Sequence, residues 1–223
     1  IKGVDTEYLK NKYNKEEELE TKGMYNILKD DFVITFIGRL VKDKGINELV
    51  ESFVILLKKY PNLKLLLVGI YEDHLYKIDK ETERLISELN SIITVGFQKD
   101  SRKFLSITDL FTLPSYREGL SNALIEAGSF GIPLLATDII GNNEVIENNE
   151  TGVLVKMKDV MSLTNGIEKF IIDKKFISYI KGNVRDKIIK KYSQNYFWRE
   201  LKDEFRKTIW YIYINHINNT SNE

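Results

Sequence analysis

The chain has 223 residues, which is enough for one substantial hydrophobic core or for one large domain with appendages. Lysine and arginine balance aspartate and glutamate at 33 each, so the composition lacks the basic excess that is typical of a nucleic-acid-binding protein. The absence of cysteine excludes disulfides, thiolate catalysis and cysteine-ligated metal sites, and it favours a cytoplasmic protein.

The first half of the chain alternates apolar strands with helices. Residues 1–31 are charged and predict an N-terminal segment with a short helix. Apolar runs that end at Gly38 and Gly69 are typical of strands buried on both faces. Between them, apolar residues recur at helical spacing until Pro61 stops the helix. The predicted elements are a strand at 32–37, a helix at 46–57, a strand at 63–68 and an exposed helix at 77–90.

The same alternation continues through the second half. The predicted elements are a strand at 92–97, a short helix at 101–108, a strand at 110–113, a helix at 121–130, a strand at 133–137, a short helix at 143–147, a strand at 152–155 and helices over most of 159–217. Short strands that alternate with helices indicate a parallel sheet with right-handed crossovers. We therefore predict the α/β class, with a Rossmann-like domain at 32–190 and a helical C-terminal extension at 191–223.

The loop after the first strand contains two cations beside a flexible turn. Gly38 ends the strand without a side chain, so a ligand can approach the backbone there. Arg39 offers a planar fork for phosphate oxygens, and Lys44 offers a point charge where the next helix begins. Taken alone, this stretch favours an ordinary charged surface loop, for which arginine and lysine are common. It is neither a Walker A loop nor a Gly-x-Gly-x-x-Gly fingerprint.

A second loop, after the strand at 110–113, combines carboxylates with a helix start. Glu118 precedes Gly119, Leu120, Ser121 and Asn122, whose amides lie where the next helix begins and could face an anion. Glu126 follows in the second turn of that helix, at a depth that suits a ribose diol. The alternative is structural: Ser121 is then a helix N-cap and Glu126 a solvated helix residue.

Two further segments favour a structural interpretation at least as strongly as a functional one. Phe97 follows a strand with Gly96 inside it, and this strand exit could present groups to a nucleobase. Residues 138–144 require a turn at Gly141 and a new helix start, which we interpret as mainly structural. The two histidines, His74 and His216, lie outside any motif, so neither a Ser-His-Asp triad nor a histidine-rich metal site is expected.

In these motifs the chain resembles the C-terminal domain of a family 4 glycosyltransferase, a retaining enzyme of the GT-B fold. The resemblance covers roughly residues 3–200 and rests on segments in the family's order and spacing. They are Gly3-Val4-Asp5 (with Lys2 where the family has Asn), the diphosphate loop at 36–45, the Glu-x7-Glu signature within 115–127, and the segments 131–138, 141–146 and 152–155.

The resemblance implies a role for each matched residue. Arg39 and Lys44 would hold the donor diphosphate and stabilise the departing nucleotide, with Gly38 and the amides of residues 119–121 completing the cradle. Glu118 would contact hydroxyls of the transferred sugar, and Glu126 would contact the ribose. We accordingly predict Glu118, Arg39 and Lys44 as the catalytic set. The donor-binding set is Gly38, Arg39, Lys44, Phe97, Glu118, Gly119, Leu120, Ser121, Asn122 and Glu126.

The resemblance also implies partners. The expected substrate is a nucleotide sugar, with a UDP-hexose favoured, and no cofactor or metal is expected. The acceptor would be a saccharide or lipid-linked saccharide bound by an N-terminal domain that this chain lacks. We therefore expect a fragment of an enzyme that works in the cytoplasm, with the inner face of the membrane as a candidate location. The apolar stretch at 205–214 would pack either on that missing domain or on the domain to which it belongs. A non-catalytic sugar-nucleotide-binding module and a GT-B-fold UDP-sugar epimerase are the alternatives.

Overall fold

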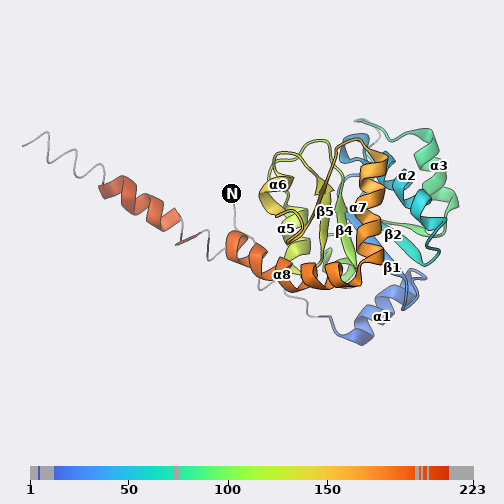
Figure 1. The fold of residues 1–223 in the computed structure, drawn as a ribbon, viewed down its shortest axis with the longest axis horizontal. Coiled ribbons are helices and arrows are strands. Elements are labelled where there is room, and N and C mark those ends of the chain that lie inside the picture. Colours follow the sequence, from blue (N-terminus) through green and yellow to red (C-terminus); the bar gives the residue numbers. More distant parts are fainter. Residues whose placement is uncertain are drawn as a thin grey trace, which may run out of the picture.

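The computed structural model describes residues 5, 13–72, 76–193, 196, 198–199 and 201–210. Its centre is a six-stranded sheet in the order β3-β2-β1-β4-β5-β6, with every neighbouring pair parallel (Figure 1). The strands are β1 (Phe32–Ile37), β2 (Leu63–Val68), β3 (Ile92–Gly96), β4 (Leu110–Leu113), β5 (Leu134–Thr137) and β6 (Gly152–Val155). The predicted Rossmann-like α/β fold is therefore confirmed.

Helices connect these strands as the periodicity indicates. They are α1 (Lys15–Met24), the short 3-10 helix η1 (Lys42–Lys44), α2 (Ile46–Leu57), α3 (Lys80–Glu88), α4 (Arg102–Leu105), α5 (Asn122–Ser129), α6 (Asn142–Val145), α7 (Val160–Ile172) and α8 (Lys174–Tyr192). The helix predicted at 77–90 is shorter than expected. Asp79 has an extended backbone and caps the helix, so residues 77–79 lie outside α3.

The central strands bury side chains on both faces. Ile34 and Phe36 pack into the larger core with residues of α2, α5, α7 and α8, whereas Val33 packs into a second cluster with Phe104 and Ile107. Successive side chains of a strand point to opposite faces, so this alternation requires cover on each side of the sheet. In the second cluster Tyr25, just after α1, meets Phe104 edge-on, with ring centroids 5.7 Å apart.

The order of the sheet reverses between β1 and β4. The chain runs from β1 outward to β3 and then returns to the centre with β4. Two side-chain contacts fasten this junction: the Val33 amide donates to Asp109 (3.0 Å), and the hydroxyls of Thr35 and Thr108 lie 2.7 Å apart. Loops leaving the carboxyl ends of strands on the two sides of such a reversal separate and leave a crevice between them. Both loops singled out by sequence begin here.

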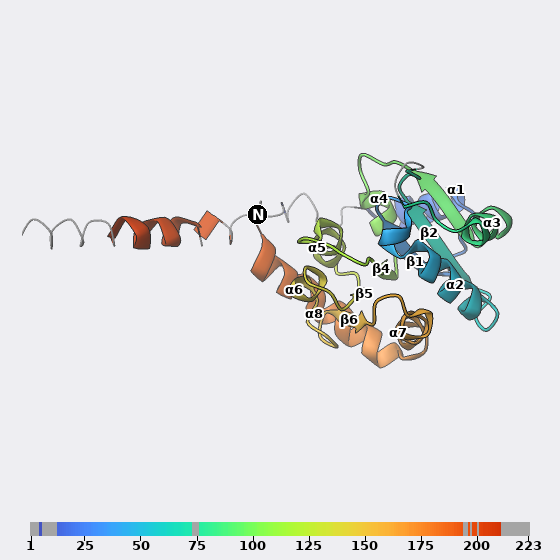
Figure 2. The same ribbon diagram turned by 90° about the horizontal axis from the view of Figure 1, so that it is seen from above.

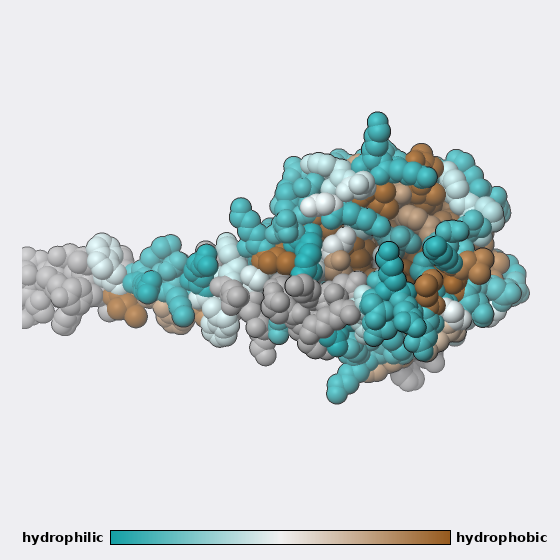
Figure 3. All heavy atoms as spheres, turned by 90° about the horizontal axis from the view of Figure 1, so that it is seen from below, coloured by the Kyte–Doolittle hydropathy of each residue, from teal (hydrophilic) through white to brown (hydrophobic). Residues whose placement is uncertain are grey.

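The C-terminal extension leaves the domain after α8. Residues 201–210 form a helix that points away from the sheet (Figures 1 and 2). Phe205, Ile209 and Trp210 of the predicted apolar stretch are exposed, and apolar residues appear along this arm in Figure 3. Residues 211–214 of that stretch lie outside the described residues, as do Gly3, Val4 and both histidines. None of the described helices is both long and apolar enough to cross a membrane.

Candidate functional site: a polar cavity at the β1 and β4 strand ends

The two predicted loops meet through Lys44 and Glu118. The ammonium of Lys44 lies 2.7 Å from a carboxylate oxygen of Glu118, although 74 residues separate them in the chain. Both side chains are largely buried, at 16% and 15% exposure, so solvent screens this ion pair only partly. Lys44 is presented by η1 after β1, and Glu118 by the loop after β4. A cation and a carboxylate predicted for one crevice are thus in contact.

A cavity of about 280 Å³ opens beside this pair. Its apolar lining comes mainly from the ends of β1 and β4, while its polar groups come from the two loops. The lining residues are Phe36, Ile37, Gly38, Lys44, Leu113, Glu118, Leu120, Ser121, Asn122 and Ala123. An apolar floor with a few convergent polar groups is the usual composition of a small-molecule site.

The N-terminus of α5 faces this cavity. Ser121 caps the helix, with its hydroxyl accepting from the Leu124 amide at 3.4 Å, and Asn122 is the first helical residue. The structural interpretation of Ser121 is therefore confirmed, and the residue also lines the cavity. The amides at the start of a helix lack helical partners, and the helix dipole adds positive potential there. Together with Lys44, this end of α5 suits an anionic ligand.

Arg39 directly follows the lining residue Gly38 but is not itself among the described residues that line the cavity. Its guanidinium pairs with Glu72 at 2.8 Å, and both side chains are substantially exposed. This hydrogen bond and the charge of Glu72, with smaller contributions from Asp43 and Glu118, raise the pKa of Arg39. An exposed pair of this kind stabilises the fold little, so a ligand phosphate can take the place of Glu72 at small cost.

Glu126 lies one turn into α5, on a half-buried face between the buried Ile125 and Ala127. It is absent from the lining of the cavity. Burial, and secondarily the charge of Asp100, raise the pKa of Glu126 above its ordinary value of about 4.5. A carboxylate held in such surroundings without an opposite charge is unfavourable for the fold, which is a common mark of a group kept for function.

Replacing Glu126 by glutamine should therefore stabilise the free protein at neutral pH. Because the folded state raises this pKa, the contribution of the Glu126 carboxyl to stability is fully present below about pH 4.5 and is lost as the pH rises through the folded-state pKa. The melting temperature of Glu126→Gln should exceed that of the wild type at pH 7 and match it near pH 4. The exposed Glu51→Gln on α2 should change neither value. A lower melting temperature for Glu126→Gln at pH 7 would contradict the burial argument.

The two other predicted donor-binding residues lie outside the cavity lining. Phe97 is 72% exposed just after β3, and Gly119 is exposed next to Glu118. Gly119 has a different neighbour: a Cβ atom at Gly141 would lie 1.8 Å from its carbonyl oxygen. Gly141 has a φ of 95°, so only glycine fits comfortably there. The 138–144 segment thus packs against the Glu118 loop at Gly119, in agreement with its structural interpretation.

Sequence reasoning missed three polar residues near the cavity. Asp43 and Glu48 each have a carboxylate oxygen that is buried and has no hydrogen-bond partner in the described part of the chain. Tyr116 donates to the other oxygen of Glu48 at 2.6 Å. Asp43 looked like ordinary surface charge between two lysines, and Glu48 like a solvated helix residue. The sequence held one signal that could have pointed to these residues, namely Tyr116 directly before Arg117 and Glu118.

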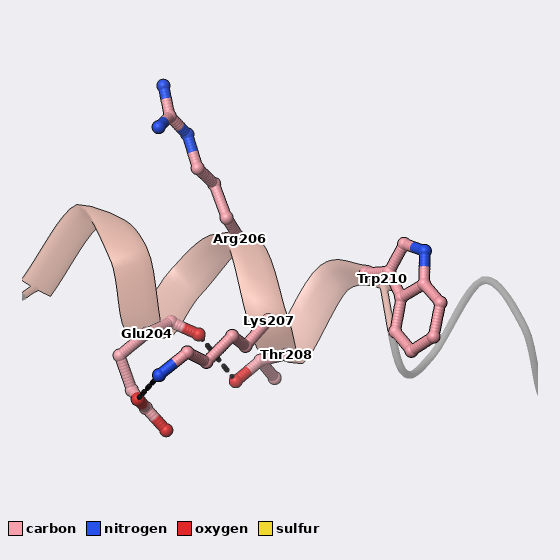
Figure 4. Close-up of a pocket in the computed structure, with 5 residues that line it drawn as sticks. All are labelled: Glu204, Arg206, Lys207, Thr208 and Trp210. Atoms are coloured by element: carbon pink, nitrogen blue, oxygen red, sulfur yellow. Dashed lines mark hydrogen bonds and ion pairs between the residues drawn. The ribbon is translucent and has the colours of Figure 1, made fainter.

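A second hollow, of about 670 Å³, lies along the C-terminal arm (Figure 4). The described residues that line it come from one helical stretch, and two of their polar side chains are paired with Glu204 of the same stretch. Thr208 donates to the Glu204 carbonyl at 3.0 Å, and Lys207 pairs with the Glu204 carboxylate at 3.8 Å. The Arg206 side chain points away from these groups in Figure 4. Among the described residues this hollow brings no separate elements together, so the cavity between β1 and β4 is the better candidate site.

Comparison with known proteins identifies the family. A model described as "Glycosyl transferases group 1" matches residues 17–191. The chain belongs to the group 1 glycosyl transferases. The match confirms the resemblance that the motifs predicted, and the fold of the chain is that of one half of a GT-B glycosyltransferase.

Two relatives of this group 1 chain carry the names of specific glycosyltransferases. It is 33% identical over 202 residues to the capsular polysaccharide biosynthesis glycosyltransferase CapM of Staphylococcus aureus, covering 91% of this chain and 50% of CapM. It is 28% identical over 192 residues to the UDP-Gal:alpha-D-GlcNAc-diphosphoundecaprenol alpha-1,3-galactosyltransferase of Escherichia coli, covering 84% and 48%. The chain spans about half the length of these relatives.

Solved structures agree with this assignment. The C-terminal domain of a group 1 glycosyl transferase (LpcC) from Francisella tularensis superimposes with a TM-score of 0.75 at 26% identity, covering 86% of this chain and 99% of that one. Alr3699/HepE of Anabaena, solved with UDP and glucose, gives a TM-score of 0.81 at 21% identity, covering 92% and 55%. This group 1 chain thus corresponds in extent to the C-terminal domain of LpcC.

Proposed function

We propose that this chain is the donor-binding half of a retaining glycosyltransferase. The whole enzyme would move a hexose from a UDP-sugar to a growing polysaccharide or lipid-linked saccharide. The contact between Lys44 and Glu118 at the mouth of a polar cavity carries the proposal. A relative named for UDP-Gal and a neighbour solved with UDP support uridine as the base, and CapM supports a capsular product.

Two cations and a helix start would bind the diphosphate of the donor. Lys44 lines the cavity, Arg39 directly follows the lining residue Gly38, and the free amides of α5 complete the arrangement. Negative charge grows on the leaving phosphate as the glycosidic bond breaks. Groups already oriented toward that charge stabilise it without reorganising, which makes them electrostatic catalysts. These residues would perform the work that a metal ion does in other transferases.

Glu118 would exchange its partner when the donor binds. In the free protein its carboxylate neutralises Lys44. Once phosphate oxygens take that ammonium, Glu118 is able to accept hydrogen bonds from hydroxyls of the sugar. The leaving phosphate would receive the proton of the acceptor hydroxyl as the new glycosidic bond forms on the same face of the sugar. Glu118 then needs no nucleophilic role, and Glu126 would contact the ribose.

The acceptor and the cellular site follow from the rest of the enzyme. An N-terminal domain would bind the saccharide, and the full-length protein would work in the cytoplasm at the inner face of the membrane. The name of the Escherichia coli relative, whose acceptor is a diphosphoundecaprenol lipid, supports this location.

Titration calorimetry with UDP tests the binding half of the proposal. This chain should bind UDP weakly but saturably, at micromolar to millimolar concentration, and should transfer no sugar by itself. No heat at millimolar UDP would contradict the proposal. Assaying the full-length protein with a panel of UDP-sugars separates the alternatives, because an enzyme transfers sugar while a binding module only retains the nucleotide. An epimerase would instead convert the UDP-sugar without an acceptor.

A further inference from the structure

One tyrosine connects the loop that carries Lys44 to the loop that carries Glu118. The backbone amide of Tyr116 donates to the Asp43 carbonyl at 2.8 Å, and its hydroxyl donates to Glu48 at 2.6 Å. Asp43 directly precedes Lys44, while Glu48 lies in the first turn of α2. Tyr116 thus contacts the β1–α2 connection on both sides of Lys44, two residues before Glu118.

The surroundings of Tyr116 favour the hydrogen bond from its hydroxyl to Glu48. Burial, followed by the bond to Glu48, raises the pKa of Tyr116, so the hydroxyl keeps its proton and donates. The ammonium of Lys158 lies 4.6 Å from the centre of the ring and favours the ring's position by a cation–π contact. The second oxygen of Glu48 is buried and unpartnered. Losing the hydroxyl would therefore leave a buried carboxylate without this donor.

Other contacts support the Glu118 loop on either side of Tyr116: Arg117 pairs with the Asp43 carboxylate at 3.6 Å, and Gly141 packs against the Gly119 carbonyl. Thr137 donates to the Ser115 carbonyl at 2.5 Å, and Gly45 lies directly against the Pro114 carbonyl. These contacts hold the beginning of the loop against β5 and the start of α2. The hydrogen bond from the Tyr116 hydroxyl attaches the loop to Glu48 of α2, the helix that follows Lys44.

We propose that Tyr116 is a positioning residue that sets the distance between Lys44 and Glu118 through its hydrogen bond to Glu48. This inference rests on the proposed function, because it assigns the pair to the donor site. Tyr116 would touch no substrate. It would keep the ammonium and the carboxylate in the separation that a diphosphate and a sugar require.

Affinity for UDP, measured by calorimetry on this chain, tests the proposal. Tyr116→Phe removes the hydroxyl alone and should weaken UDP binding about 3- to 10-fold, less than the full value of a hydrogen bond to a charged group, because this bond acts on the ligand only through the positions of Lys44 and Glu118. Glu48→Ala removes the same bond from the other side and should weaken binding equally. Glu48→Gln keeps an acceptor oxygen and should restore affinity to within about 2-fold of the wild type. The double variant Tyr116→Phe/Glu48→Ala should be no weaker than either single variant.

A matched control separates positioning from general stability. Tyr60 also donates to a glutamate, Glu168 of α7, at 2.8 Å, and this pair lies beyond the C-terminus of α2 and outside the cavity lining. Tyr60→Phe should lower the melting temperature in the manner of Tyr116→Phe and leave UDP affinity unchanged. Wild-type affinity in Tyr116→Phe, or an equal loss in Tyr60→Phe, would overturn the inference. If Lys44→Met also binds UDP normally, the proposed donor site itself fails, and the two failures are thereby distinguished.

Discussion

Replacing Lys44 by methionine is expected to weaken UDP binding about 10- to 100-fold, or ~1.5–3 kcal/mol, the usual magnitude for a charge-assisted hydrogen bond in a partly dry cavity. Methionine keeps the length and the apolar stem of lysine but removes its charge. Glu118 would then lie at the cavity mouth with 15% exposure and no ammonium beside it. A bound diphosphate would meet this carboxylate unopposed, so the loss should exceed that of one neutral contact.

Lys59 provides the matched control for this variant. Its ammonium pairs with Glu168 of α7 at 2.6 Å, just beyond the C-terminus of α2 and away from the cavity, although its side chain is more exposed than that of Lys44. Calorimetry should find the same UDP affinity for Lys59→Met as for the wild type. Equal affinities for Lys44→Met and the wild type would mean that the diphosphate binds elsewhere.

The second large effect is expected at Gly45, which lies between the two loops. Its φ of 71° disfavours any residue with a side chain, and a Cβ atom there would lie 2.1 Å from the carbonyl oxygen of Pro114. Gly45→Ala should reduce the free energy of unfolding by about 2–4 kcal/mol, combining left-handed strain with the overpacked contact. Relief of that contact must move either the Lys44 loop or the Glu118 loop, so UDP binding should be lost as well.

Gly131 separates the two causes. It has a similar φ of 80°, but the nearest atom to an added Cβ is the Arg185 Cβ at 3.9 Å, an ordinary contact. Gly131→Ala should therefore lose only about 1–2 kcal/mol from backbone strain and should bind UDP normally. Thermal unfolding together with UDP titration checks both variants. Similar behaviour of the two alanine variants would show that the contact with Pro114 is unimportant.

The fold could be predicted from sequence because each of its signals is local. Strands buried on both faces appear as continuous apolar runs, as at 32–37 and 63–68, and glycine or proline marks their ends. The short strands between helices then leave a parallel sheet as the simplest solution. The exact start of α3 was not visible, because the Asp79 amide is bound by Asn47, a residue 32 positions away.

The candidate site was predictable only in part, for a similar reason. Lys44 and Glu118 could be placed together because both follow the carboxyl ends of neighbouring strands. The pairing of Arg39 with Glu72 and of Tyr116 with Glu48 depends on side-chain directions that spacing does not specify. Glu126 has the predicted helical position, yet it lies away from the cavity lining. Its role as a ribose ligand remains a prediction.

The junction of β1 with β4 has a consequence for how ligand recognition arises. Each of these strands carries one of the two loops, and the bond from Val33 to Asp109 joins residues 76 positions apart. Closing so long a segment costs conformational entropy before any contact within the crevice can form. The half of the sheet that contains β1 and the half that contains β4 each provide only one of the two loops. Affinity for a nucleotide should therefore appear only when the whole domain is folded, and should be lost when either half unfolds.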